Sequence, residues 1–166
     1  RRDRSDANAV GGVHAAIMRD YGKTVTELDF GKSVYFQKRN GGNDAVVCGD
    51  FLEFAPEETF DCIWASHVLE HQPNPGAFIN HCIAITRDDG LLAITVPPRK
   101  DAIVGGHLTL WNAGLLLYQL VFAGLDCREA AVRTYGYNVS VIVRKARRPA
   151  VELDYDNGDI DRLAGL

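Results

Sequence analysis

The order of apolar and polar positions along the chain predicts strands that alternate with helices. Short apolar runs bounded by polar or turn residues are typical of strands, and they occupy residues 23–29, 44–50, 59–66 and 90–98. Segments with helical spacing or with helix start and stop signals occupy residues 12–22, 33–40, 74–87 and 112–124. Two further strand-like runs, 129–136 and 138–146, predict a terminal hairpin that turns at residues 136–138.

The two longest helical segments carry the clearest signals. Pro75 stands in the first turn of the helix predicted over residues 74–87. One face of that helix is apolar and consists of Phe78, Ile79, Cys82 and Ile85. In residues 112–124, Gly124 is the expected end of a largely apolar helix.

Strands that alternate with helices imply βαβ units and a mainly parallel sheet, the doubly wound α/β class. Near-continuous apolar strands fit a sheet that is covered on both faces. Ligands of such sheets bind beyond the carboxyl ends of the strands, so the residues that end the strands are the informative ones. These residues are Asp29, Asp50, Ser66 with His67, and Pro97 with Pro98.

The composition is that of a soluble globular domain. The 166 residues suggest one domain, 46% of them are hydrophobic, and the net charge of −4 gives no reason to expect a nucleic-acid partner. The longest apolar stretch, residues 113–125, is too short to span a membrane. No signal peptide is visible in a chain that starts without Met, and the apolar runs around Cys48 and Cys62 predict reduced core cysteines in a cytoplasmic protein.

The segment "FDCIWASHVLEHQPNPGAFINHCIAITRDDGLLAITVP", residues 60–97, resembles class I S-adenosylmethionine (SAM)-dependent methyltransferases. That family has an apolar strand, a "vLEH" segment, a helix, a glycine turn and a strand that ends in Pro. Upstream, "VVCGDF" resembles the family's adenine-contacting segment, and "TVTELDF" resembles the strand whose terminal acid holds the ribose. The resemblance covers about residues 6–145 and implies a Rossmann-like methyltransferase fold.

The resemblance implies SAM as the cofactor and assigns its contacts. Asp29 would accept hydrogen bonds from the ribose hydroxyls, with Phe30 beside it, and Asp50 would accept from the adenine amine, with Phe51 against the ring. The residues implied near the methionine end are Ser66 and His67. A carboxylate suits both kinds of donor, and a sulfonium cation disfavours basic neighbours. The chain has no GxxxxGK[ST] loop, which argues against a nucleoside triphosphate.

The family's acidic, glycine-rich loop is only partly present. Its counterpart is "DANAVGGVH", in which Asp6 takes the acidic position, Gly12 matches the third glycine and Gly11 is an additional glycine. Val10 places a β-branched side chain where glycine would let the backbone approach the cofactor closely. Three explanations remain open: the first strand is missing, the loop has degenerated, or the register differs. Gly11 and Gly12 can also simply precede a helix.

His67, Glu70 and His71 have i, i+3, i+4 spacing, which puts them on one face if the segment is helical. Two imidazoles and a carboxylate can bind a divalent metal. Because the set contains only one acid, we instead predict a site without metal. In this interpretation His67 is the general base, since its ordinary pKa suits deprotonation of a hydroxyl, and Glu70 and His71 brace the segment.

Residues 99–114 form a glycine-containing loop before a helix and carry His107 and Trp111, the predicted contacts for the methyl acceptor. Trp111 can equally be a hydrophobic anchor at the start of a core helix. We expect a methyltransferase-like domain over residues 1–146. Residues 147–166 are expected to be an acidic C-terminal tail, either solvated or docked.

Two functions are compatible with these features. The first is SAM-dependent methyl transfer to an O or N atom of a small molecule, such as a saccharide or a secondary metabolite, without a nucleic-acid or membrane partner. Asp29, Asp50 and His67 favour it. The alternative is a catalytically impaired methyltransferase-like module that binds a partner, and the incomplete glycine loop favours it. A Rossmann-type dehydrogenase explains less, because the "HVLEH" segment has no role in it. The oligomeric state is left open.

Overall fold

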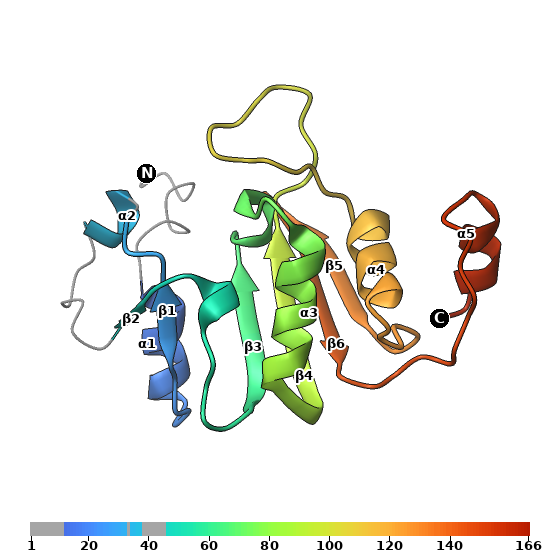
Figure 1. Cartoon of the computed structure of the whole chain (residues 1–166). Coiled ribbons are helices and arrows are strands. Elements are labelled where there is room, and N and C mark those ends of the chain that lie inside the picture. Colours follow the sequence, from blue (N-terminus) through green and yellow to red (C-terminus); the bar gives the residue numbers. More distant parts are fainter. Residues whose placement is uncertain (1–11, 33, 38–45) are drawn as a thin grey trace. The chain divides into compact units, whose positions relative to one another are not determined.

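The computed structural model describes residues 12–32, 34–37 and 46–166 (Figure 1). The chain divides into two compact units, Arg1–Phe54 and Ala55–Leu166, and each is described by itself. None of the helices in the described ranges has both the length and the apolar character needed to cross a bilayer.

The first unit contains a small parallel sheet. Its elements are α1 (Val13–Asp20), β1 (Glu27–Asp29), α2 (Val34–Gln37), β2 (Val46–Cys48) and the short 3₁₀ helix η2 (Phe51–Glu53). β1 and β2 are parallel neighbours in which Asp29 lies opposite Cys48. Gly12 precedes α1 with a φ of 90°, a left-handed conformation that favours glycine. Asp29 is the last residue of β1 and Asp50 comes shortly after β2, so these two predicted acids lie at adjacent strand ends.

The second unit contains a four-stranded sheet of order β3-β4-β6-β5. Its elements are β3 (Phe60–Ser66), η3 (Leu69–His71), α3 (Pro75–Ile85), β4 (Thr86–Val96), α4 (Ala113–Phe122), β5 (Ala131–Tyr135), β6 (Asn138–Arg144) and α5 (Gly158–Leu163). β3 and β4 are parallel, and β6 runs antiparallel to both β4 and β5. The predicted α/β class and the predicted terminal hairpin are both confirmed.

One face of this sheet forms the core. Alternate residues of β4 and the paired residues of β6 are almost completely buried: Leu92, Ile94, Val96, Val139, Val141 and Val143. In Figure 1, α3 and α4 lie against the sheet, and α3 contacts β4 while α4 contacts β5 and β6. The buried residues of α3 are the four that helical spacing predicted: Phe78, Ile79, Cys82 and Ile85. Burial of such side chains is the main stabilising term of the unit.

Both helices begin at an asparagine cap, and α4 ends at the predicted glycine. The side chains of Asn74 and Asn112 each accept a hydrogen bond from a backbone N–H in the first turn of α3 and α4. At the end of α4, the N–H groups of Gly124 and Leu125 donate to the carbonyls of Val121 and Leu120, which is a Schellman motif. Gly124 adopts a φ of 97°, so its predicted role as the helix end is confirmed.

Three local predictions are wrong. Cys48 and Cys62 are exposed, not core residues, because each lies on a strand with several exposed residues. The expectation of two covered faces holds for residues 92–96 of β4, whereas Trp64 of β3 is 47% exposed. The helix predicted to residue 87 ends at Ile85, because Thr86 already pairs with Phe60 in the sheet.

The C-terminal segment is docked at two points. Leu163 of α5 is buried, and the backbone carbonyl of Leu166 accepts a hydrogen bond from the N–H of Cys127. The carboxylate of Asp159 is also buried, and it accepts hydrogen bonds from the N–H groups of Asp154 and Tyr155 at 3.0 and 2.7 Å. The docked alternative therefore describes this segment better than the solvated one, and the domain boundary at residue 146 stays a prediction.

Gly90 is expected to resist any larger residue. Between Phe60 and Cys62 the register of β3 and β4 shifts, and a Cβ at Gly90 would lie 2.7 Å from Cγ2 of Thr86 and 3.0 Å from the carbonyl oxygen of Asp61. Gly90→Ala should therefore lower the free energy of unfolding by about 1–3 kcal/mol, the usual cost of overpacking. Chemical denaturation measures this loss. The control is Gly105→Ala, whose Cβ would meet open space; equal stability of both variants would contradict the prediction.

The tail should loosen in acid. The backbone hydrogen bond from Asp154, together with that from Tyr155 and the charge of Arg162, holds the pKa of Asp159 below its ordinary value of 3.8. A depressed pKa stabilises the fold above the ordinary value, and this contribution is lost as the pH falls through the lowered pKa. Asp159→Asn should therefore increase hydrogen exchange of residues 154–163 at pH 7, and the difference from the parent should shrink below pH 3.8. A difference that is constant with pH would refute this assignment.

Candidate functional site

His67 lies where β3 ends, and its backbone turns the chain sharply. Its φ is 55°, in the left-handed region, and its N–H donates to the carbonyl of Thr95 in β4 at 2.9 Å. The preceding residue, Ser66, is half-buried and pairs with Thr95 in the sheet. His67 is one of the residue types that enter this region more readily than most non-glycine residues. The turn directs the chain from β3 into η3.

Glu70, the middle residue of η3, is fully buried. Its backbone carbonyl accepts from the N–H groups of Leu108 and Thr109 at 2.8 and 3.3 Å. These contacts hold the loop that follows β4 against η3. His71 also holds this loop, because its Nδ1 forms a hydrogen bond of 2.6 Å with the carbonyl oxygen of Gly106.

The ring of His67 bridges two segments that are distant in sequence. Its Nδ1 lies 3.1 Å from Oε1 of Glu70, and its Nε2 lies 2.8 Å from Oδ1 of Asn138 at the start of β6. The hydrogen bond to Glu70, with that to Asn138, raises the pKa of His67 above 6.5, and partial burial opposes the rise. The ring of Tyr137 stacks nearby, with its centroid 6.2 Å from that of His67. Both Tyr137 and Asn138 were missed by sequence reasoning, because no local pattern connects a hairpin turn to η3.

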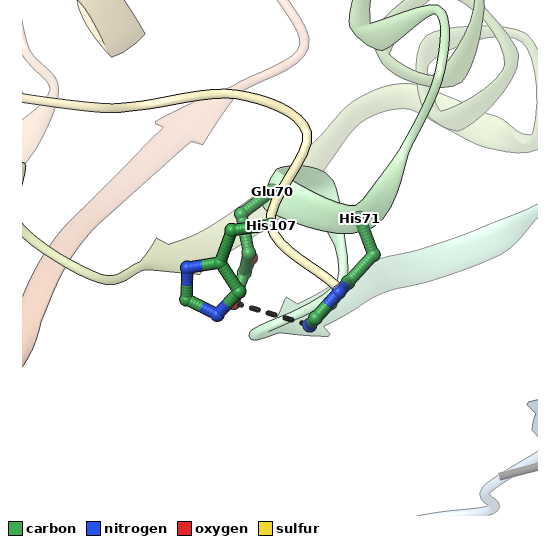
Figure 2. Close-up of side chains that lie close together, drawn as sticks. All are labelled: Glu70, His71 and His107. Carbon is green, nitrogen blue, oxygen red and sulfur yellow. Dashed lines mark ion pairs between the residues drawn. The ribbon is translucent and has the colours of Figure 1, made fainter. Parts of the chain in front are cut away.

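His107 joins the group from the loop that follows β4. Its ring meets that of His71 edge to face at 5.0 Å between centroids, and burial lowers its pKa below 6.5. Figure 2 shows Glu70, His71 and His107 gathered together, and one possible ligand atom from each lies within 4.8 Å of the others. The spacing of His67, Glu70 and His71 predicted a different trio. The fold brings His107 to the group in place of His67, whose ring faces Asn138.

The loop around His107 also contains a small hollow. Its lining includes Pro98, Lys100, His107, Trp111 and Tyr137. The ammonium of Lys100 lies 4.2 Å from the centroid of the Tyr137 ring, a cation–π contact. Trp111 is only 3% exposed and its indole N–H donates to Thr109, which agrees with the anchor alternative for this residue. Acceptor contact by His107 and Trp111 stays a prediction.

The predicted cofactor residues of the first unit lie at two neighbouring strand ends. Asp29 uses Oδ1 to accept from the N–H of Gly31 at 2.7 Å, and Asp50 uses Oδ1 to accept from the N–H of Leu52 at 2.9 Å. Each carboxylate keeps a second oxygen that makes no hydrogen bond to another described residue, so the donor groups of an adenosine fit both acids. Phe30 is 59% exposed beside Asp29. Asp6 and Gly11 lie outside the described residues.

In the first unit two acids lie at the ends of parallel strands, and in the second unit a histidine follows β3; strand ends of this kind are where ligands bind in doubly wound α/β folds. The family model described as "Methyltransferase domain" matches residues 6–94, more than half of the chain. The chain belongs to this family of class I SAM-dependent methyltransferases, and SAM is the family's cofactor.

Curated relatives match over shorter stretches. The chain is 32% identical over 101 residues to a ubiquinone biosynthesis O-methyltransferase of Glaesserella parasuis, which covers 54% of this chain and 43% of the relative. It is 34% identical over 68 residues to the protein of the same name in Bradyrhizobium sp., which covers 38% of this chain and 27% of that relative. The matched parts therefore span less than half of the length of these relatives.

Solved structures share the fold. A SAM-dependent methyltransferase of Archaeoglobus fulgidus superposes with a TM-score of 0.68 at 13% identity, over 82% of this chain and 83% of that one. A 1,6-didemethyltoxoflavin-N1-methyltransferase of Burkholderia thailandensis, with bound S-adenosylhomocysteine, gives a TM-score of 0.64 at 18% identity over 82% of this chain and 68% of that one. The predicted Rossmann-like methyltransferase fold is confirmed.

Proposed function

We propose that this chain transfers the methyl group of SAM to an O or N atom of a small molecule, such as a saccharide or a secondary metabolite. The match to the methyltransferase family over residues 6–94 carries the proposal. The names of similar proteins support a small acceptor, since they include ubiquinone biosynthesis O-methyltransferases and a didemethyltoxoflavin N1-methyltransferase.

Asp29 and Asp50 are the proposed anchors of the cofactor, with Phe30 beside the ribose and Phe51 against the adenine. Both carboxylates end parallel neighbouring strands, where nucleotides bind in doubly wound sheets. Bound SAM supplies an electrophilic methyl group on a sulfonium cation. The chain's contribution at these positions is to accept hydrogen bonds from the neutral adenosine part and to orient it.

His67 is the proposed general base. It lies at the carboxyl end of β3, and its ring is held at both nitrogens, to Glu70 and to Asn138. Nε2 lies against the acceptor oxygen Oδ1 of Asn138 and therefore carries a hydrogen in this arrangement. To act as a base, Nε2 has first to release that proton to solvent and to exchange Asn138 for the acceptor hydroxyl or amine. The side chain is partly exposed, so an acceptor can reach it.

A catalytically impaired binding module is the second candidate. The sequence feature that favours it is the incomplete glycine loop, with Val10 in place of a glycine. Such a module would retain the fold and either bind SAM without turnover or not bind it. Cofactor titration and methyl transfer separate the two functions.

The cofactor assignment predicts the effect of removing either acid. Asp29→Asn and Asp50→Asn keep a side-chain oxygen for the local turn but lose the charge that would hold the adenosine. Each should weaken S-adenosylhomocysteine binding by roughly 10–150-fold, equivalent to about 1.5–3 kcal/mol for a hydrogen bond to a charged group. Isothermal titration calorimetry measures the affinity.

The control for this titration is Asp20→Asn, which removes an exposed acid from the end of α1. It should bind as the parent does. Parent-like binding by both strand-end variants would reject the assignment. Absence of binding by the parent at millimolar ligand would instead favour the partner-binding module.

The base assignment predicts a loss of rate without a loss of cofactor. His67→Asn is the suitable variant, because Asn tolerates the left-handed backbone at this position. This variant should bind S-adenosylhomocysteine as the parent does. Its rate of methyl transfer, measured as formation of S-adenosylhomocysteine from SAM with a panel of phenols, sugars and amines, should be about 10²–10⁴-fold lower. His14→Asn, at an exposed position on α1, is the control. Unchanged turnover in His67→Asn would rule out the base.

A further inference from the structure

The loop that follows β4 is tied together at its base, which fixes where Lys100 begins. In Figure 1 this loop, drawn in yellow, extends beyond the end of β4. Pro98 forms a parallel bridge with Trp111, and the N–H of Arg99 donates to the carbonyl of Trp111 at 2.7 Å. Trp111 is almost completely buried and lines the small hollow described above. The backbone that carries Lys100, the next residue after Arg99, is therefore anchored beside this hollow.

Lys100 is a cation that has no carboxylate partner in the described part of the chain. The neighbouring guanidinium of Arg99 lies 3.2 Å from the carboxylate of Asp101 and is thereby paired. The ammonium of Lys100 instead lies 4.2 Å from the centroid of the Tyr137 ring. A cation–π contact holds an ammonium in place but does not neutralise its charge. The charge of Lys100 is therefore available to an anion.

Tyr137 connects this charge with the proposed base. It lies in the turn between β5 and β6, and its ring stacks beside that of His67 with 6.2 Å between the centroids and 15° between the planes. The same ring receives the ammonium of Lys100. A molecule that contacts Lys100 and lies along the Tyr137 ring consequently comes close to His67.

The lining of the hollow suits an organic molecule with one negative charge. Its walls include the apolar side chains of Pro98, Val104 and Leu110 and the aromatic ring of Trp111. No acidic side chain is among the described residues that line it, and Lys100 is the one lysine or arginine there. Ligand sites commonly combine apolar walls with a few placed polar groups, and a single charge selects the ligand by its sign.

We propose that Lys100 binds a carboxylate of the methyl acceptor, whose organic part lies against Tyr137 and the apolar walls of the hollow. The identity of this ligand as the acceptor rests on the proposed methyl transfer, whereas binding of the carboxylate does not. One carboxylate matches the single charge of one ammonium. A phosphate monoester carries about −1.5 to −2 charges and several strong acceptor oxygens, for which one lysine is a poor complement.

Lys100 is thus a specificity-determining residue that favours hydroxy or amino carboxylic acids over neutral sugars and phenols. Its contact is with a part of the acceptor that does not react, so the contact is equally present before and during methyl transfer. Interactions of this kind change KM and leave kcat unchanged. This separates Lys100 from His67, whose removal is expected to lower the rate.

The experiment measures binding without SAM, so that its outcome does not depend on turnover. Protocatechuate and lactate are each compared with their neutral amides, and amide chemical shifts are followed by NMR during the titrations. Each acid should bind the parent about three- to tenfold more tightly than its amide at low ionic strength, as expected for one accessible charged contact. The shifts should move within residues 98–111 and at Tyr137, and added salt should reduce the preference.

Matched variants assign the preference to one side chain. Lys100→Gln keeps the stem but removes the charge, so acid and amide should bind equally. Lys100→Arg retains the charge and should keep most of the preference. Arg99→Gln, which removes the adjacent cation already paired with Asp101, is the control and should behave as the parent does. Lys100 is exposed, so these changes should leave the fold intact.

Four results would overturn the site: equal binding of acid and amide by the parent, a preference that persists in Lys100→Gln, no binding of either acid at millimolar concentration, or tighter binding of phenyl phosphate than of protocatechuate. Failure of methyl transfer with intact carboxylate binding would count against the proposed function alone. With an acid that is methylated, Lys100→Gln should raise KM about three- to tenfold at unchanged kcat.

Discussion

Burial of the Glu70 carboxylate is the constraint on which the organisation of the candidate site depends. The backbone of Glu70 receives the loop after β4 through Leu108 and Thr109, and its side chain receives the ring of His67. His67 in turn reaches Asn138 of the terminal hairpin. A single residue of η3 thus links β3, the loop and β6. Its burial requires all three segments to be in place, since a lone buried charge is strongly unfavourable.

Two buried carboxylates, those of Asp159 and Glu70, differ in how completely their oxygens are hydrogen-bonded. Asp159 in the tail accepts from two backbone N–H groups and from Arg162, so both of its oxygens are matched within its own turn. Glu70 is equally buried, but one oxygen has no partner among the described residues. The first carboxylate stabilises a local turn. The second is incompletely satisfied and lies beside the imidazoles of His67 and His71.

Sequence reasoning was reliable where the physical cause is local. Pro75 marks the first turn of α3, Gly124 ends α4, and helical spacing identified the buried face of α3, because each of these signals acts within one or two turns. Exposure of Cys48 and Cys62 was not predictable in this way. An apolar run predicts a strand, but whether each face of that strand is covered depends on elements that are remote in the chain.

In the candidate site, too, local contacts could be predicted from the sequence and long-range contacts could not. The positions of His67, Glu70 and His71 near one another follow from their spacing, whereas Asn138 and Gly106 are 71 and 35 residues away from the histidines that they contact. Only the paired strands of the sheet and the folded loop bring Asn138 and Gly106 to these histidines, and these contacts set the hydrogen-bond partners of each ring. Asn138 occupies the Nε2 of His67, and Gly106 fixes the proton of His71 on Nδ1, which frees Nε2.

The two oxygens of the Glu70 carboxylate have different surroundings. His67 contacts Oε1, while Oε2 is unmatched among the described residues. The three histidines divide accordingly: His67 faces the hairpin, and His71 and His107 face each other across the loop. Their spacing in the sequence places His67 and His71 close together. Their hydrogen-bond partners differ, since His67 contacts Asn138 of the hairpin and His71 contacts Gly106 of the loop.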